Sequence, residues 1–147
     1  MIEPAALGGT RMRGRLDRLD TGPGGQRQLI DYKTGSLQSL RDKVGTPLED
    51  TQLAFYAALL AGDDGDGGSD SDGRPLSATY LALDDAKAPC EVPHPDVQRS
   101  AAELVQQLGG ELARMRQGTP LLALGEGRVC ETCEARGLCR RDHWGAS

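Results

Sequence analysis

Residues 14–35, GRLDRLDTGPGGQRQLIDYKTG, decide the fold of this 147-residue chain. The residues on either side of the glycine-rich centre, 11–19 and 27–33, have the composition of β-strands. The segment between them, TGPGG at 21–25, consists of residues that favour turns. The sequence therefore predicts a β-hairpin that has two aspartates and a lysine within its strands.

These polar residues form a candidate catalytic group. Successive side chains of a strand point to opposite faces, so Asp31 and Lys33 share one face and Tyr32 lies on the other. The neighbouring strand of a hairpin can bring Asp17 beside them. Two converging carboxylates repel each other, and Mg²⁺ relieves the repulsion because it binds one or two carboxylates and leaves its other positions to water and phosphate.

A lysine ammonium next to such a metal can orient the attacking water and offset charge that develops on a phosphate. The group therefore indicates Mg²⁺- or Mn²⁺-dependent cleavage of a phosphodiester. In the structural alternative, Asp31 and Lys33 form an exposed pair and Asp17 only solvates the edge of the sheet.

The rest of the chain predicts a small α/β domain with a mixed β-sheet flanked by helices. Residues 49–61 and 96–117 repeat apolar side chains at helical spacing. Residues 76–83 are apolar on both faces, as expected for an interior strand. The order is strand, strand, helix, strand, helix and a cysteine-containing tail, and we expect residues 1–147 to form a single domain.

The net charge of −5 belongs to one segment. Residues 62–73, GDDGDGGSDSDG, hold five aspartates, and without them seventeen acidic residues remain against seventeen basic ones. We expect residues 62–75 to form a disordered acidic loop. A Ca²⁺ site is the less favoured alternative, because the glutamate that closes an EF-hand loop is missing. The overall charge neither supports nor excludes DNA binding.

The sequence has no stretch of 18 apolar residues and no signal-peptide pattern. We therefore expect a cytoplasmic protein that does not cross a membrane. In that compartment, the four cysteines are expected to be metal ligands or reduced thiols rather than disulfides.

Three of the cysteines lie in the tail, residues 128–144. Cys130, Cys133 and Cys139 have the spacing C-x2-C-x5-C, which suits tetrahedral zinc or an iron–sulfur cluster. His143 could complete a zinc site. The remaining cysteine and a histidine lie in the proline-flanked segment 88–95, where we interpret Cys90 as a free thiol and His94 as solvent-exposed.

Three motifs carry a resemblance to a known family. They are Gly14-Arg15-Leu16-Asp17-Arg18-Leu19-Asp20, then Leu29-Ile30-Asp31-Tyr32-Lys33-Thr34-Gly35, and then Gln52 with Tyr56. Together they resemble the PD-(D/E)XK nuclease superfamily, whose core is restriction-endonuclease-like. Within it the chain is similar to the RecB/AddB-like exonuclease domains, which include the CRISPR adaptation exonucleases.

The resemblance implies roles for these residues. Asp17 and Asp31 would bind the metal together with the backbone carbonyl of Tyr32, and Lys33 would act beside them. Gln52 and Tyr56, which share one helix face by their i, i+4 spacing, would lie next to the active site. Tyr56 as a core residue is the alternative. Arg18 and Asp20 also fit the motif, with Arg18 either a phosphate contact or an exposed strand residue.

The resemblance also extends to the tail. In the AddB-type nuclease, three C-terminal cysteines and one upstream cysteine hold a [4Fe–4S] cluster, which here implies Cys130, Cys133 and Cys139. This chain departs from the family because no cysteine precedes Asp17 and the N-terminal helix with its acidic or histidine site residue is absent. Glu3 is too close to the strand to replace it. We therefore expect an N-terminally incomplete domain, a C-terminal piece of a larger nuclease.

The sequence thus predicts a metal-dependent DNA exonuclease domain of RecB/AddB type, acting in recombination or repair with a helicase subunit or domain as its partner. The alternative is a non-catalytic DNA- or helicase-binding module with a tail held by an iron–sulfur cluster or zinc. A zinc-binding regulatory domain is the third possibility.

Overall fold

The computed structural model of the chain describes residues 7, 9–46, 50–62, 75–84, 88–120, 130 and 133–139. The chain divides into two compact units, Met1–Leu112 and Ala113–Ser147, which we describe separately. Residues 63–74, most of the predicted acidic loop, lie outside the described residues. Among the described helices, none is long and apolar enough to cross a membrane.

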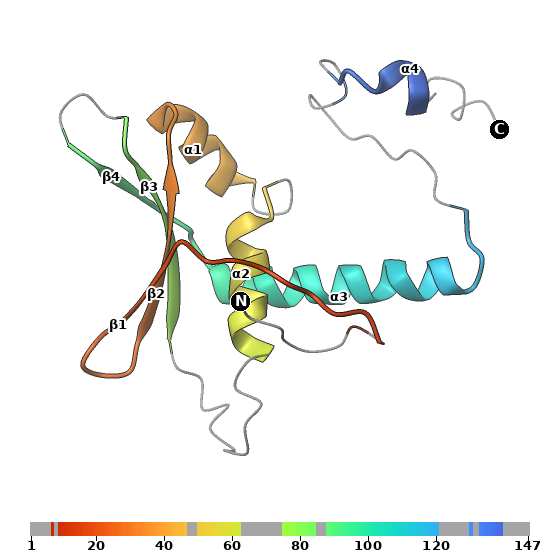
Figure 1. Ribbon diagram of the computed structural model, residues 1–147, viewed down its shortest axis with the longest axis horizontal. Coiled ribbons are helices and arrows are strands. Elements are labelled where there is room, and N and C mark those ends of the chain that lie inside the picture. The colour runs from red at the N-terminus through yellow and green to blue at the C-terminus, as the bar shows by residue number, and fades with distance from the viewer. Residues whose placement is uncertain are drawn as a thin grey trace. The chain divides into compact units, whose positions relative to one another are not determined.

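A four-stranded mixed β-sheet forms the first unit together with helices (Figure 1). Its strands, in the order in which they pair, are β1 (Arg18–Thr21), β2 (Arg27–Lys33), β3 (Leu76–Ala82) and β4 (Cys90–Pro93). β1 and β2 form the predicted antiparallel hairpin, β2 and β3 are parallel, and β3 and β4 are antiparallel. The mixed α/β architecture that the sequence predicts is confirmed.

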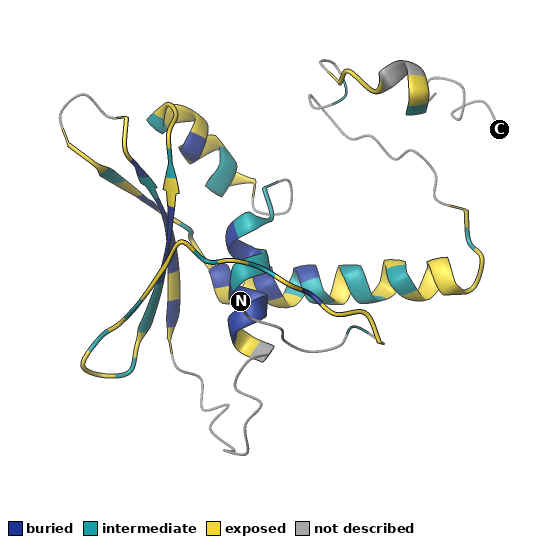
Figure 2. Ribbon diagram, in the orientation of Figure 1, coloured by how far each residue is buried: buried dark blue, intermediate teal, exposed yellow. Residues whose placement is uncertain are grey.

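Two helices connect the parallel strands, because parallel neighbours need a crossover rather than a tight turn. They are α1 (Leu37–Gly45) and α2 (Gln52–Gly62), and Figure 1 shows both on one side of the sheet. A third helix, α3 (Val97–Arg116), begins after β4 and contributes its first turns to the same core. Figure 2 shows buried residues along one side of these first turns, whereas the later turns are mostly exposed.

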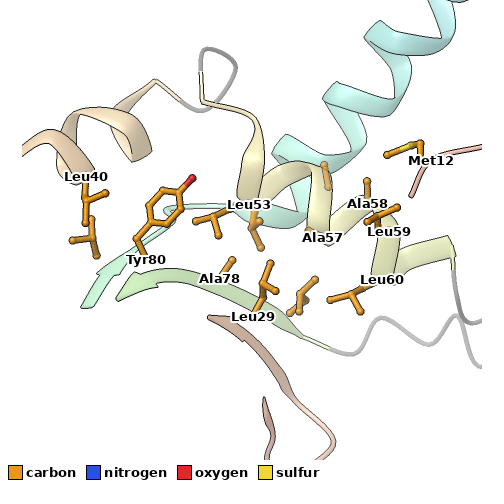
Figure 3. Close-up of a cluster of buried hydrophobic side chains, with 14 of the residues drawn as sticks. Met12, Leu29, Leu40, Leu53, Ala57, Ala58, Leu59, Leu60, Ala78 and Tyr80 are labelled. Atoms are coloured by element: carbon orange, nitrogen blue, oxygen red, sulfur yellow. The ribbon is translucent and has the colours of Figure 1, made fainter. Parts of the chain in front are cut away.

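The core is made of small and aliphatic side chains, in keeping with an aromatic content of 3%. Figure 3 shows Leu29 and Ala78 of the sheet facing Leu53 and Ala57 of α2. The large aromatic residue of this core is Tyr80 of β3, which is 1% exposed. Burying these apolar surfaces contributes about 25 cal/mol per Å² to folding and holds α2 against β2 and β3.

The structure corrects the predicted boundaries at the N-terminal side of the hairpin. The strand expected over 11–19 is confined to β1, and the residues before Arg18 instead pass along α2. Met12 is buried in the core, and a Cβ added to Gly14 would lie 2.4 Å from Leu59 Cδ1. The apolar side of this segment therefore packs against helix α2 and does not pair within the sheet.

Two elements were not predicted. α1 begins after Ser36, whose side chain accepts a hydrogen bond of 3.2 Å from the Ser39 backbone N–H and so caps the helix. β4 lies within the proline-flanked segment 88–95, for which the sequence predicted no strand. Prolines are compatible with an edge strand, and Val92 of β4 is buried against the core.

Candidate functional site

The candidate site lies where the end of β2 meets the start of α2. Asp31 and Lys33 lie on the same face of β2 as the buried core residue Leu29, as the alternation of side chains predicts. This face packs against α2, so Asp31 is only 2% exposed. Tyr32 projects to the other face and is 37% exposed.

Gln52, the first residue of α2, joins the two charged residues of β2. Its Oε1 accepts a hydrogen bond of 2.7 Å from Lys33 Nζ, and its Nε2 donates one of 2.9 Å to Asp31 Oδ1. Lys33 Nζ also lies 2.7 Å from Asp31 Oδ2, which closes a triangle of three side chains. Gln52 Nε2 is 3.3 Å from the hydroxyl of Tyr56, one turn along the helix. These contacts fix the direction of the Gln52 amide.

Asp17 lies just before β1 and reaches the backbone of β2. Its Oδ2 accepts a hydrogen bond of 3.1 Å from the backbone N–H of Tyr32, the residue between Asp31 and Lys33. The structure therefore brings all five residues singled out in the sequence into one neighbourhood: Asp17, Asp31, Lys33, Gln52 and Tyr56.

Burial raises the pKa of Asp31, and the negative charges of Asp17 and Asp50 act in the same direction. Lys33 opposes the shift without cancelling it. Asp31 Oδ2 forms the ion pair with Lys33 but has no partner with hydrogen-bond geometry in the described part of the chain. A carboxylate oxygen has more than one lone pair, so Oδ2 can ligate a cation while it stays in its ion pair with Lys33.

The family resemblance implies Mg²⁺ here, and the donor set can be compared with that requirement. Within the described residues, no group of three or more His, Cys, Asp or Glu side chains gathers as a metal site. Mg²⁺ binds through one or two carboxylates and keeps several waters, so the pair of Asp17 and Asp31 meets its needs. The hard oxygen donors and the available Asp31 Oδ2 fit this ion.

A second carboxylate centre, not singled out in the sequence, supports the start of α2. Asp50 Oδ1 accepts a hydrogen bond of 2.6 Å from the Tyr80 hydroxyl and one of 3.4 Å from the Gln52 backbone N–H. Asp50 Oδ2 lies 2.9 Å from Lys43 Nζ of α1. Figure 3 shows the Tyr80 ring between Leu40 and Leu53. We call Asp50, Tyr80 and Lys43 the Asp50 brace.

Electrostatics of the brace differ from those of Asp31. Burial acts to raise the pKa of Asp50, but the bonds from Lys43 and Tyr80 together outweigh it and the pKa is lowered. Burial and the Asp50 charge raise the pKa of Tyr80 well above its ordinary value, so the hydroxyl stays protonated and donates. The available sequence signal was Asp50 itself, since aspartate just before a helix commonly bonds to a backbone N–H of the first turn.

An open pocket of about 400 Å³ lies beside the triangle. It shares Gln52 and Tyr56 with the candidate site. Its lining residues come from α2, from the residues just before α2 and from the segment that passes along it: Arg13, Gly14, Asp50, Thr51, Gln52, Phe55 and Tyr56. We call it the Phe55 pocket.

Arg18 and Asp20 form their own pair away from Asp31. Arg18 Nε and Nη2 donate to the two carboxylate oxygens of Asp20 at 2.8 and 2.7 Å. Arg18 is opposite Ile30 in the hairpin register and contacts the Tyr32 hydroxyl at 3.5 Å, so it lies on the face of the sheet that Asp31 does not use. Of the two alternatives for Arg18, a phosphate contact or an exposed strand residue, this placement favours the exposed strand residue.

The other polar residues of interest lie apart from the triangle. Cys90 begins β4 and packs against the core. His94, expected to be exposed, is half-buried, because its N–H continues the sheet by donating to the Ala78 carbonyl at 2.8 Å. Its Nδ1 accepts a hydrogen bond from the Asp96 N–H, and burial lowers its pKa. His143 and Glu3 lie outside the described residues.

The second unit contains the tail cysteines. The short helix α4 (Arg136–Cys139) ends at Cys139, which is half-buried like Cys130, whereas Cys133 is exposed. In the part of this unit that the structure describes, the three thiols do not gather into a metal-binding group. The predicted cluster is therefore not supported by the described residues, and no chemical step is assigned to it.

A model of a protein family, described as the PD-(D/E)XK nuclease superfamily, matches residues 2–140. No curated protein and no solved structure gives a significant match to the chain. The matched range contains the hairpin, the triangle and the Asp50 brace, and it spans nearly the whole chain. This protein belongs to the PD-(D/E)XK nuclease superfamily.

Proposed function

We propose that the chain is a Mg²⁺- or Mn²⁺-dependent deoxyribonuclease domain of the RecB/AddB-like exonuclease type. The observation that carries the proposal is the closed triangle of Asp31, Lys33 and Gln52, with Asp17 hydrogen-bonded to the backbone N–H of Tyr32. A buried carboxylate with a raised pKa beside a second carboxylate is costly to the fold, and such groups are concentrated at functional sites.

In this proposal Asp17 and Asp31 hold the metal, with the Tyr32 backbone carbonyl as a further ligand. When bound, the ion would polarise the phosphodiester and make a water more acidic. Lys33 supplies a positive charge next to the phosphate and orients the attacking water. Gln52 holds the Lys33 ammonium at 2.7 Å, and the Tyr56 hydroxyl restrains the Gln52 amide from the other side.

The sharpest test measures hydrolysis of linear DNA by the full chain in Mg²⁺, in Mn²⁺ and in EDTA. We expect cleavage only with metal, and a loss of about a thousandfold in rate for Lys33→Ala. Glu103→Gln is the matched control, because it neutralises an exposed ion pair on α3 far along the sequence from the triangle. Full activity of Lys33→Ala, with an unchanged melting temperature, would reject the proposal.

A non-catalytic DNA- or helicase-binding module is the second candidate. The observation that favours it is the direct neutralisation of Asp31 by Lys33 at 2.7 Å, which is also what a purely structural pair would show. This candidate predicts that DNA binds the chain without cleavage in either metal. It also predicts that Lys33→Ala changes stability rather than turnover.

We further propose that the domain acts in DNA recombination or repair beside a helicase subunit or domain, a role implied by the resemblance of its motifs to RecB/AddB-like domains. For the tail, a [4Fe–4S] cluster held by Cys130, Cys133 and Cys139 stays a prediction from the sequence, with zinc as the alternative. Anaerobic purification followed by visible absorption and by iron, sulfide and zinc analysis separates the two. Stoichiometric zinc without iron would exclude the cluster.

A further inference from the structure

The Phe55 pocket directly adjoins the triangle. Gln52 belongs to both, donating to Asp31 on one side and lining the pocket on the other. Tyr56 is likewise shared, since its hydroxyl lies 3.3 Å from Gln52 Nε2. A group held in the pocket therefore lies next to whatever binds at Asp31 and Lys33.

The pocket wall combines aromatic and polar groups. Phe55 and Tyr56 are adjacent rings in an edge-to-face arrangement, with centroids 6.1 Å apart and an angle of 61° between their planes. Thr51 adds a hydroxyl, and Arg13 and Asp50 add one positive and one negative group. The two adjacent rings and the polar groups beside them make the pocket suited to a flat, polar-edged ring.

Gly14 lets the backbone of its segment lie directly against the wall of the pocket. A Cβ at this position would lie 2.4 Å from Leu59 Cδ1, 3.3 Å from Tyr56 Cε1 and 3.4 Å from Phe55 Cε1. The backbone before Asp17 thus runs against both rings without a side chain between them. Leu59 is fully buried and cannot move aside freely, so any larger residue at 14 would press on the wall of the pocket.

We infer that the Phe55 pocket receives an unpaired nucleobase of the DNA strand, adjacent to the phosphodiester held at Asp31 and Lys33. The inference rests on the proposed nuclease function and specifies its substrate as single-stranded or frayed DNA. A base inside a duplex is stacked and paired on both sides and cannot enter a concave pocket without leaving the helix. Stacking on aromatic side chains is the usual means of holding an unpaired base.

The test measures binding rather than cleavage, so it is independent of turnover. The full chain is titrated in EDTA with a fluorescent single-stranded DNA of about ten nucleotides, and then with versions lacking one base at each successive position. We expect one position at which removal of the base weakens binding by about fivefold to a hundredfold. Phe55→Ala should weaken binding of the intact strand by the same factor as removal of that base. It should leave binding of the strand that lacks this base unchanged.

Two further variants keep the test decisive. Phe55→Leu retains apolar bulk and so serves in place of Phe55→Ala if that variant does not fold. It should lose most of the base-dependent part of the affinity. Leu83→Ala, which truncates an exposed apolar side chain outside the pocket, should change nothing. The inference is overturned if no single base matters, if the intact strand does not bind, or if Phe55 variants weaken intact and abasic strands alike.

Failure of this inference differs from failure of the proposed function. If Lys33→Ala abolishes cleavage but removal of bases has no effect, the nuclease assignment holds and the pocket is not a base site. If a base-dependent affinity is found while cleavage never occurs in Mg²⁺ or Mn²⁺, the pocket is a base site in a non-catalytic DNA-binding module.

Discussion

Asp31 and Asp50 are carboxylates of one small site, close enough for the charge of Asp50 to raise the pKa of Asp31. Asp50 is satisfied by a hydroxyl, an ammonium and a backbone N–H, and its pKa is lowered. Asp31 is more deeply buried, 2% exposed against 16% for the Asp50 side chain, and its pKa is raised. The surroundings of Asp50 stabilise its negative charge. The surroundings of Asp31 disfavour its negative charge, which a bound cation would stabilise.

This difference separates two roles within one network. The bonds of the Asp50 brace join β3, α1 and the start of α2, and they fix the point from which Gln52 reaches Asp31 and Lys33. We therefore assign the brace to the stability and placement of α2. The triangle carries the proposed chemistry. The predictions below test whether activity and stability divide between the two carboxylates in this way.

The largest expected effect is on turnover by Asp31→Asn. This change keeps the shape of the side chain and removes its charge, so the proposed metal site loses a ligand. We expect hydrolysis of linear DNA to fall by about a thousandfold, which corresponds to about 4 kcal/mol of transition-state stabilisation. Because burial disfavours the ionised carboxylate, the melting temperature in EDTA should not fall. Unimpaired hydrolysis by a folded variant would contradict the division of roles.

Asp50→Asn should lower the stability of the fold rather than act on turnover directly. It removes the ion pair with Lys43 and weakens the short bond from the Tyr80 hydroxyl. We expect the free energy of unfolding at neutral pH to fall by about 2 kcal/mol, since hydrogen bonds to charged groups contribute about 1.5–3 kcal/mol each. Urea unfolding followed by circular dichroism measures this. Asp42→Asn, which removes an exposed carboxylate of α1, is the control and should stay within about 0.5 kcal/mol of the parent.

The pH dependence of that loss gives a further check. The folded-state pKa of Asp50 is below its unfolded value of about 3.9, so its stabilising contribution is fully present above that value. It is lost as pH falls through the folded-state pKa. The difference in unfolding free energy between parent and Asp50→Asn should therefore be constant from about pH 7 to pH 5 and shrink below about pH 4. A difference that does not change with pH would show that the ionised form of Asp50 is not what stabilises the fold.

The parts of this site that the sequence predicted depend on local periodicity, on the hairpin that places Asp17, and on the family resemblance that places Gln52 and Tyr56 beside the active site. Alternation along a strand placed Asp31 and Lys33 together, and i, i+4 spacing placed Gln52 with Tyr56. The Asp50 brace depends instead on pairing between residues far apart in the chain, since Tyr80 lies 30 positions after Asp50. Nothing in the composition of β3 marks one tyrosine hydroxyl as the partner of a particular carboxylate.

The errors in the predicted elements have related causes. The segment before Arg18 has strand-like composition, yet tertiary packing of Met12 and Gly14 against α2 takes it out of the sheet. β4 was not predicted because the prolines in and around it argue against a strand, although an edge strand tolerates them. α1, in contrast, could have been found, because Ser36 precedes apolar residues at helical spacing, Leu37, Leu40 and Val44.

The smallest expected effect comes from Tyr80→Phe, which removes one hydroxyl and keeps the ring. The ring centroid lies 5.4 Å from Lys33 Nζ and 6.0 Å from Lys43 Nζ, so both cation contacts with the aromatic face are preserved. Asp50 loses a donor at 2.6 Å but keeps Lys43 and the Gln52 N–H. We expect a loss of about 1–1.5 kcal/mol in unfolding free energy, less than for Asp50→Asn. Because both changes affect the same hydrogen bond, the double variant should lose less unfolding free energy than the sum of the losses of the two single variants. Fully additive losses would mean that the hydroxyl and the carboxylate stabilise the fold independently of each other.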